Sequence, residues 1–206
     1  MSSFRDRAFV PSHAIDPVLV ICPGFHEKAA TQAFLTSLTA SIELQPAQIL
    51  VIDPDRTPVF SGVHIFWDIQ AYLKHQLGDR WQQVPLLFIG FSAGIVGAAG
   101  AVWKWNASGG CVKALIALDG WGVPLWGEFP IHRLSHDSFT HWSSALLGAG
   151  LDSFYADPGV EHLDLWRSPQ TAIGWHYSHQ TMTKVRRTSA QDFLKFLLNQ
   201  YLSNNI

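Results

Sequence analysis

Short apolar runs recur along the chain and are separated by longer segments of a different pattern. Four runs are rich in Val, Ile and Leu without polar alternation: VLVIC (18–22), ILVID (49–53), LLFIG (86–90) and ALIALD (114–119). Such runs are typical of parallel strands that are covered on both faces. Two weaker runs follow, IHRLSH (131–136) and SFYAD (153–157). The pattern therefore predicts a mostly parallel sheet of about six strands.

The segments between these runs have helical spacing. Apolar residues recur every three to four positions within 34–42 and 66–77, and small residues dominate 93–105. The last segment, 189–202, opens with a capping-box-like pattern at Ser189 and carries an apolar stripe. Alternating strands and helices predict a doubly wound α/β fold with helices on both faces of the sheet.

One connection in this scheme is unusually short. About a dozen residues, with two prolines and three glycines, separate Asp119 from Ile131. Two parallel strands normally need a helical crossover of about that length or more. We expect a shortened, irregular loop here, which is too small to be a cap domain.

Composition fits one globular domain over residues 1–206 with no separate cap domain. Hydrophobic residues make up 48% of the 206 positions and charged residues 15%, which is ample for a core. The formal net charge is −2 and no Lys/Arg-rich run occurs, so the sequence lacks the footprint of a nucleic-acid-binding protein.

Compartment is indicated by the cysteines and by the N-terminal sequence. Cys22 and Cys111 cannot make a disulfide framework, and both are expected to be buried in a reducing environment. The N-terminal MSSFRDRAFVPSH has no apolar signal region, and no apolar stretch reaches the roughly 20 residues that span a bilayer. We expect a cytoplasmic protein without stable membrane insertion.

The pentapeptide Gly90-Phe91-Ser92-Ala93-Gly94 stands where a strand-like run gives way to a helix-like one. A sharp turn there would raise the serine hydroxyl above the sheet edge, beside free N–H groups at the start of the helix. The motif in this context resembles the nucleophile elbow of the α/β-hydrolases, and the similarity runs from VLVICPGFHE to the C-terminal helix. It implies a three-layer fold of α/β-hydrolase type with Ser92 as nucleophile. The alternative interpretation is an ordinary turn serine.

The resemblance also implies an acid, which follows the nucleophile along the chain in this family. Asp137 ends FPIHRLSHD, a stretch similar to the family's acid-bearing strand, and is the preferred residue. Asp119 ends ALIALD one strand earlier and is the alternative, because some members carry the acid there.

The catalytic base of the family follows the last strand and precedes the final helix. Of ten histidines, His162 fits this position best, and the stretch EHLDL around it is similar to the family pattern. His176 is the alternative, since it also precedes the final helix. His136 and His141 either line the pocket or lie on the surface.

The family's oxyanion hole uses two backbone N–H groups. Ala93, directly after the nucleophile, is expected to supply one, and Phe25 in the Pro-Gly-Phe loop the other. Four side chains are expected to shape the substrate pocket: His26, Phe91, Trp121 and Trp142.

These residues predict a serine hydrolase that cleaves a carboxylic ester or thioester of a small or apolar substrate through an acyl-enzyme on Ser92. The alternative is a catalytically inactive relative that binds a ligand or protein partner through its aromatic loops. No metal-ligand spacing and no cofactor motif is present, so we expect neither a metal nor a cofactor. Nothing in the sequence indicates the oligomeric state.

Overall fold

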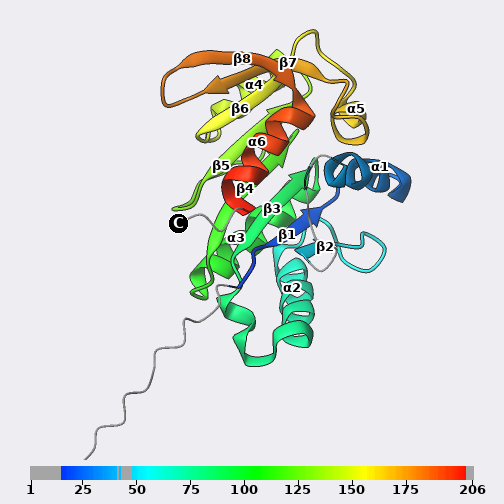
Figure 1. The fold of residues 1–206 in the computed structure, drawn as a ribbon, viewed down its shortest axis with the longest axis vertical. Coiled ribbons are helices and arrows are strands. Elements are labelled where there is room, and N and C mark those ends of the chain that lie inside the picture. The colour runs from blue at the N-terminus through cyan, green and yellow to red at the C-terminus, as the bar shows by residue number, and fades with distance from the viewer. Residues whose placement is uncertain (1–14, 41, 43–47, 203–206) are drawn as a thin grey trace, which may run out of the picture.

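The protein is an α/β structure built on one sheet (Figure 1). The computed structural model describes residues 15–40, 42 and 48–202. Eight strands form the sheet in the order β2-β1-β3-β4-β5-β6-β7-β8. Their bounds are β1 (Val18–Cys22), β2 (Ile49–Val51), β3 (Leu86–Phe91), β4 (Val112–Leu118), β5 (Ile131–Ser135), β6 (Asp152–Ala156), β7 (Ile173–Ser178) and β8 (Thr183–Ser189).

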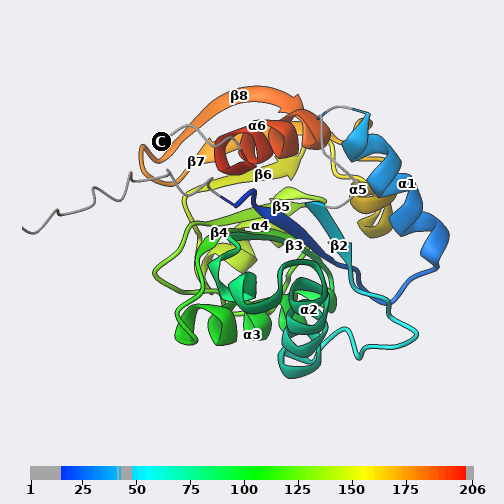
Figure 2. The same cartoon turned by 60° about the horizontal axis from the view of Figure 1, so that its bottom comes forward.

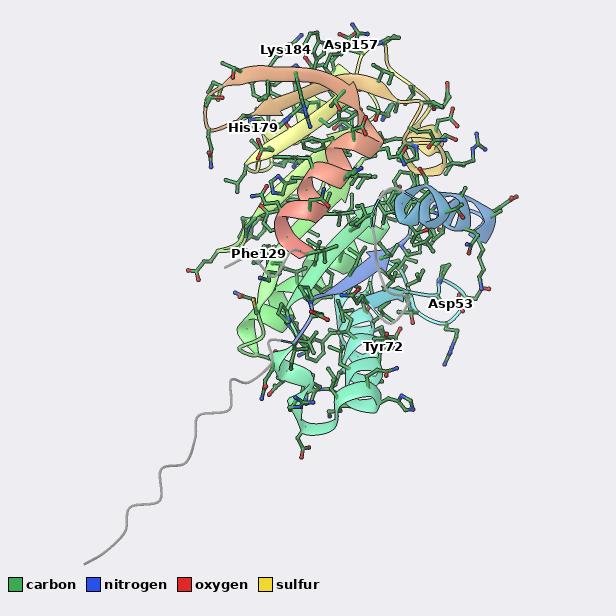
Figure 3. All side chains as sticks on the ribbon, in the orientation of Figure 1. Asp53, Tyr72, Phe129, Asp157, His179 and Lys184 are labelled. Atoms are coloured by element: carbon green, nitrogen blue, oxygen red, sulfur yellow. The ribbon has the colours of Figure 1, made fainter. Side chains whose placement is uncertain are left out.

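Six of the strands pair in parallel, and these are the six that the apolar runs predict. The antiparallel strands β7 and β8 extend the sheet beyond the prediction. The sequence of β8, TKVRRTS, contains no apolar run because the strand is almost wholly exposed and mostly polar at the sheet edge. Lys184 belongs to β8 (Figure 3). Its ammonium lies 4.4 Å from the ring centre of Trp175 on β7. Such an edge lysine hinders pairing with another chain.

Six α-helices accompany the sheet in the described part of the chain. They are α1 (Lys28–Thr39), α2 (Gly62–Leu77), α3 (Gly94–Ala107), α4 (Ser138–Ala145), α5 (His162–Arg167) and α6 (Ala190–Leu202), and a 3₁₀ helix, η2 (Gly78–Gln83), follows α2. Helices α2 and α3 cover one face of the sheet, and α1 and α6 cover the other (Figure 2). Ser189 caps α6 as the pattern predicts, because its hydroxyl accepts the Asp192 N–H at 3.0 Å, and it donates to the Asp192 carboxylate at 2.8 Å.

Two apolar layers hold these elements together. Val20 and Phe88 point to the layer shared with α2 and α3, whereas Leu19 and Ile89 point to the layer shared with α1 and α6. Both layers are buried, so alternate residues of the central strands enter opposite cores. This explains why those strands have no polar alternation.

The short connection between β4 and β5 crosses over without a helix, as the sequence predicts. The buried guanidinium of Arg133 on β5 holds it by donating to the carbonyls of Val123 at 2.9 Å and of Gly148 at 2.6 Å. Gly120 and Leu147 accept further, longer bonds from the same group. One arginine thus ties together the two loops that follow β4 and α4.

The cysteine prediction is half right. Cys22 is buried, but Cys111 is exposed because it precedes β4 at the protein surface. Both thiols are free. None of the helices among the described residues combines the length and the apolarity that a membrane crossing requires. The N-terminal segment used for the prediction about secretion lies outside the described residues.

Candidate active site

Ser92 occupies a sharp turn between β3 and α3, as the motif predicts. Its φ is 52°, a left-handed conformation that side-chain-bearing residues rarely adopt. Two flanking glycines are required by close packing. A Cβ on Gly94 would lie 2.3 Å from the Cys22 carbonyl oxygen, and one on Gly90 would lie 3.0 Å from Ile95 Cα. The glycines therefore allow the chain to turn at Ser92 while β1 and α3 stay in contact.

The loop after β1 approaches the same turn. A Cβ on Gly24 would lie 3.0 Å from Ser92 Cβ and 2.9 Å from the Phe91 carbonyl oxygen, so the loop backbone passes directly over the serine. Neither the N–H of Phe25 nor that of Ala93 donates to another group within the described residues. Both N–H groups are therefore available as hydrogen-bond donors at this turn, and their role in an oxyanion hole stays a prediction.

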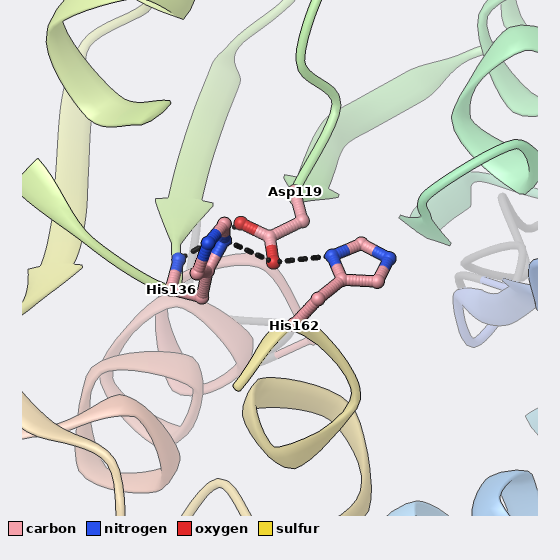
Figure 4. Close-up of side chains that lie close together, drawn as sticks. All are labelled: Asp119, His136 and His162. Carbon is pink, nitrogen blue, oxygen red and sulfur yellow. Dashed lines mark hydrogen bonds and ion pairs between the residues drawn. The ribbon is translucent and has the colours of Figure 1, made fainter. Parts of the chain in front are cut away.

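The Nδ1 atom of His162 lies 2.8 Å from Oδ2 of Asp119 (Figure 4). Asp119 directly follows β4 and is 5% exposed, whereas the His162 side chain is 47% exposed. The Nε2 atom of His162 points away from the carboxylate in Figure 4. The carboxylate can thus hold the imidazole so that Nε2 is free to accept a proton. Between the described residues Ser92 and His162 there is no hydrogen bond in this structure.

The sequence-based preference for Asp137 over Asp119 as the partner of His162 is wrong. Asp137 caps α4, with its Oδ1 accepting the Thr140 N–H at 2.7 Å. The reason lies in the sheet order. Strand β4 is paired with β3, and the Ser92 N–H donates to the Leu118 carbonyl at 3.0 Å, which places Asp119 beside the serine. Asp137 follows β5, one strand farther away.

His162 begins α5 and follows β6. The expectation that it follows the last strand is wrong, since β7 and β8 come later in the chain. Its ring stacks on Phe91, with centroids 4.7 Å apart and planes at 23°. Phe91 also stacks on Trp166, one turn further along α5, and Trp166 stacks on Phe34 of α1. The imidazole therefore rests on a column of buried aromatic rings.

A second histidine binds the same carboxylate. His136 donates its backbone N–H to Oδ1 of Asp119 at 2.8 Å, and its Nδ1 lies 2.9 Å from Oδ2 (Figure 4). Its Nε2 lies 3.5 Å from Oδ2 of Asp137. The sequence left His136 as a pocket or surface residue, and only its adjacency to Asp137 could have drawn attention to it. Asp137 thus belongs to the cluster through His136, and has no contact with His162.

His176, the alternative base, lies elsewhere. It belongs to β7, is buried, and its Nε2 is 3.0 Å from Asp152 at the start of β6. Since β6 is parallel to β3, its first residue lies at the edge of the sheet opposite to Ser92. His176 therefore cannot act on the serine.

A cavity of about 500 Å³ opens above the turn. It is lined by Ser92, Ala93, Val96, Asp119, Trp121, Val123, His136, Phe139, Thr140 and His162. The sequence predicts four side chains to shape the pocket, and of these Trp121 alone lines the cavity. Phe91 is buried beneath His162, His26 bonds to Thr31 behind Phe91, and Trp142 packs against Tyr177.

Burial and hydrogen bonding oppose each other at the carboxylate. Burial alone would raise the pKa of Asp119, but the hydrogen bonds from His136 and His162 outweigh it and hold that pKa below its ordinary value. The hydrogen bond to Asp119 raises the pKa of His136, with further contributions from the charges of Asp137 and Glu161. The arrangement therefore favours an ionised Asp119 beside a protonated His136.

Asp119, His136 and His162 are also residues of metal-binding types, and their ligand atoms lie within 4.8 Å of one another. However, both Nδ1 atoms approach the same carboxylate oxygen at hydrogen-bond distance. This geometry is that of two imidazole N–H groups donating to one carboxylate oxygen. Histidines that bound a metal would instead direct their nitrogen lone pairs at the metal ion, which would lie away from that oxygen. We therefore assign these residues no metal.

Comparison with protein-family models and with curated proteins finds no match for this sequence. The functional argument therefore rests on the geometry of the site.

Proposed function

We propose that the protein is a serine hydrolase that cleaves a carboxylic ester, with Ser92 as nucleophile, His162 as base and Asp119 as the acid that orients the base. The observation that carries this proposal is that a serine in a left-handed strand-to-helix turn and a His–Asp pair line one cavity. A fold of α/β-hydrolase type is part of the proposal, supported by the motif and by the chain order of serine, acid and histidine.

In the proposed reaction, Asp119 accepts the Nδ1–H of His162, so that Nε2 is the basic nitrogen. Nε2 takes the Ser92 proton as Oγ attacks the ester carbonyl, and the N–H groups of Phe25 and Ala93 bind the oxyanion. The imidazolium then protonates the leaving alcohol, which leaves an acyl-enzyme. His162 then deprotonates a water molecule, which attacks the acyl carbon. The bond from that carbon to Ser92 Oγ breaks, and the imidazolium returns the proton to Oγ as the acid leaves. The Ser92 hydroxyl must turn toward Nε2 when substrate binds, since such bonds often form only in the complex.

The cavity suits an apolar substrate. Besides the proposed catalytic side chains it presents Val96, Trp121, Val123 and Phe139, and none of the lining residues that the structure describes is a lysine or arginine. We therefore propose a small or apolar ester or thioester, without a phosphate-bearing carrier, as the substrate. The free thiols of Cys22 and Cys111 suit a cytoplasmic location for this reaction.

Labelling with a fluorophosphonate probe tests the proposal. We expect the wild-type protein to be labelled and to hydrolyse short-chain p-nitrophenyl esters, and Ser92→Ala to do neither. Ser143→Ala is the matched control, because the Ser143 hydroxyl bonds only to carbonyls of its own helix, and it should react like the wild type. A wild-type protein that is folded but neither labelled nor active would favour the alternative, an inactive ligand-binding protein.

A further inference from the structure

The Asp119 carboxylate contacts two histidines, whereas the proposed mechanism requires only one. His162 approaches Oδ2 with Nδ1 at 2.8 Å, and His136 approaches the same atom at 2.9 Å. The backbone N–H of His136 also occupies Oδ1 at 2.8 Å. One residue therefore contacts both carboxylate oxygens, and it fixes the plane of the carboxylate that His162 needs.

The backbone of Asp119 is itself strained, with a φ of 55°. A residue in this conformation keeps its orientation only if surrounding contacts determine it. The two bonds from His136 and the bond from the Asp119 N–H to the Leu134 carbonyl, at 2.8 Å, supply such contacts. Strand β5 thus positions the acid that β4 carries.

The charge of Asp119 needs compensation because the carboxylate is almost fully buried, with a side-chain exposure of 1%. In the resting state His162 must be neutral to act as base, so it cannot supply a full counter-charge. His136, which directly follows β5, contacts both Asp119 and Asp137, and Asp137 caps α4. Glu161, which precedes α5, lies close enough for its charge to act on His136. Three carboxylates therefore favour the imidazolium form of His136.

The ring of His136 also lies close to that of His162, with centroids 5.9 Å apart and planes at 83°. A positive charge at that distance opposes protonation of His162, whereas Asp119 favours it. The imidazole of His162 therefore lies between two opposing charges, those of His136 and Asp119.

We propose that His136 is a positioning residue for the reaction: it fixes both oxygens of Asp119, and its imidazolium offsets the charge of that carboxylate, which extends to lower pH the range in which His162 acts as base. This inference rests on the proposed function for its kinetic consequence, and the cluster geometry carries it. The residue adds to the three catalytic groups without contacting the reacting atoms.

Two substitutions separate the two effects of His136. His136→Asn retains a side-chain N–H donor near the position of Nδ1 but carries no charge, whereas His136→Leu removes both. We expect kcat to fall about 10- to 100-fold in His136→Leu and only a few-fold in His136→Asn, with KM within about twofold in both. The acidic limb of the kcat/KM profile should move up by about half to one pH unit in both variants.

His75→Leu is the matched control, because it makes the same substitution at an exposed histidine. His75 belongs to α2, which lies against one face of the sheet. It should leave both kcat and the pH profile unchanged. Thermal melting of each variant shows whether it is folded, and His136→Asn keeps the test open if His136→Leu is not. An acidic limb that stays within about 0.2 units of the wild type in His136→Asn would overturn the proposal.

A second measurement keeps the inference separate from the proposed function. Imidazole nitrogen signals of His162, followed by NMR against pH, should show a higher titration midpoint in His136→Asn than in the wild type. This result would support the inference even if the wild type hydrolysed no ester, in which case only the proposed function would fail. Equal midpoints in an active enzyme would overturn the inference and leave the proposed function standing.

Discussion

The ring of Phe91 lies flat beneath the imidazole of His162, 4.7 Å away, and Phe91 is the residue directly before Ser92. The strand that carries the proposed nucleophile therefore also supports the proposed base. Because Trp166 and Phe34 continue the stack, the position of the imidazole depends on aromatic packing as well as on its bond to Asp119. The sequence predicts Phe91 as a side chain of the substrate pocket, whereas in the structure it lies beneath the imidazole.

Replacing Phe91 by Leu should reduce activity more than it reduces stability. The smaller side chain leaves the His162 ring unsupported on one face, and we expect kcat for a p-nitrophenyl ester to fall about tenfold with little change in KM. The free energy of unfolding should fall by about 1–2 kcal/mol, because Phe91 is buried. Urea unfolding measures the second effect. Unchanged kcat in a folded Phe91→Leu protein would show that the stack does not position the base.

The two candidate acids should separate clearly when each is replaced by Asn. Asp119→Asn should lower kcat/KM by about 10³- to 10⁴-fold, since an amide cannot stabilise the imidazolium and can enforce the wrong tautomer of His162. Asp137→Asn should cost less than about tenfold, because Asn also caps helices and Asp137 reaches the pair only through His136. The reverse order of effects would restore Asp137 as the acid.

Strain at Ser92 should be measurable in inactive variants. Glycine adopts positive φ at little cost, whereas alanine does not, so Ser92→Gly should exceed Ser92→Ala in unfolding free energy by about 1 kcal/mol. Both lack the nucleophile and should be inactive. Urea unfolding of the two proteins under identical conditions gives the comparison. An alanine variant as stable as the glycine variant would mean that the turn relaxes in solution.

Acid should destabilise the fold through two buried histidines. Burial lowers the pKa of His132 to about 4, and burial with the nearby His179 and Arg133 lowers that of His141 to about 4. In the unfolded chain both titrate near 6.5, so the unfolded state binds more protons between about pH 6.5 and 4. The stability that these neutral histidines contribute should be fully present above that range. As pH drops through the range, the free energy of unfolding should fall by up to the order of 3 kcal/mol for each histidine.

Urea unfolding at pH 7.5 and pH 5 measures this loss. His141→Phe should show a smaller loss than the wild type, because the variant has one fewer group that takes up a proton on unfolding. The exposed His75→Gln serves as control and should keep the wild-type dependence. Equal losses in all three proteins would exclude His141 as a source of the acid sensitivity.

Chelation should leave the activity intact. The bonds from His136 and His162 to Asp119 occupy the carboxylate oxygen that a metal would need. We therefore expect the same kcat after prolonged dialysis against EDTA, measured with the same ester. Loss of activity that Zn²⁺ or Mn²⁺ restores would instead make the Asp119, His136 and His162 cluster a metal centre.

The part of the fold that sequence predicts well is the part with the simplest burial pattern. Strands β1 and β3 and most of β4 are buried on both faces, so their continuous apolar runs are distinctive, and helix α2 has a clear apolar stripe. Strand β8 has no apolar run because it is an exposed edge strand, and β7, IGWHYS, contains only one aliphatic residue although it lies between β6 and β8. Without these two strands, the prediction placed His162 after the last strand, and its selection among the histidines rested partly on that position and partly on the surrounding EHLDL stretch.

The sequence by itself determined the strand–helix alternation and the turn at Ser92, because glycine spacing and apolar runs encode local backbone geometry and burial. Only the tertiary structure decided which acid meets His162 and that His136 joins them. Those contacts depend on which strands are neighbours in the sheet, and β4 lies beside β3 whereas β5 lies one strand beyond. A separation of 43 residues between Asp119 and His162 carries no local signal of a 2.8 Å bond.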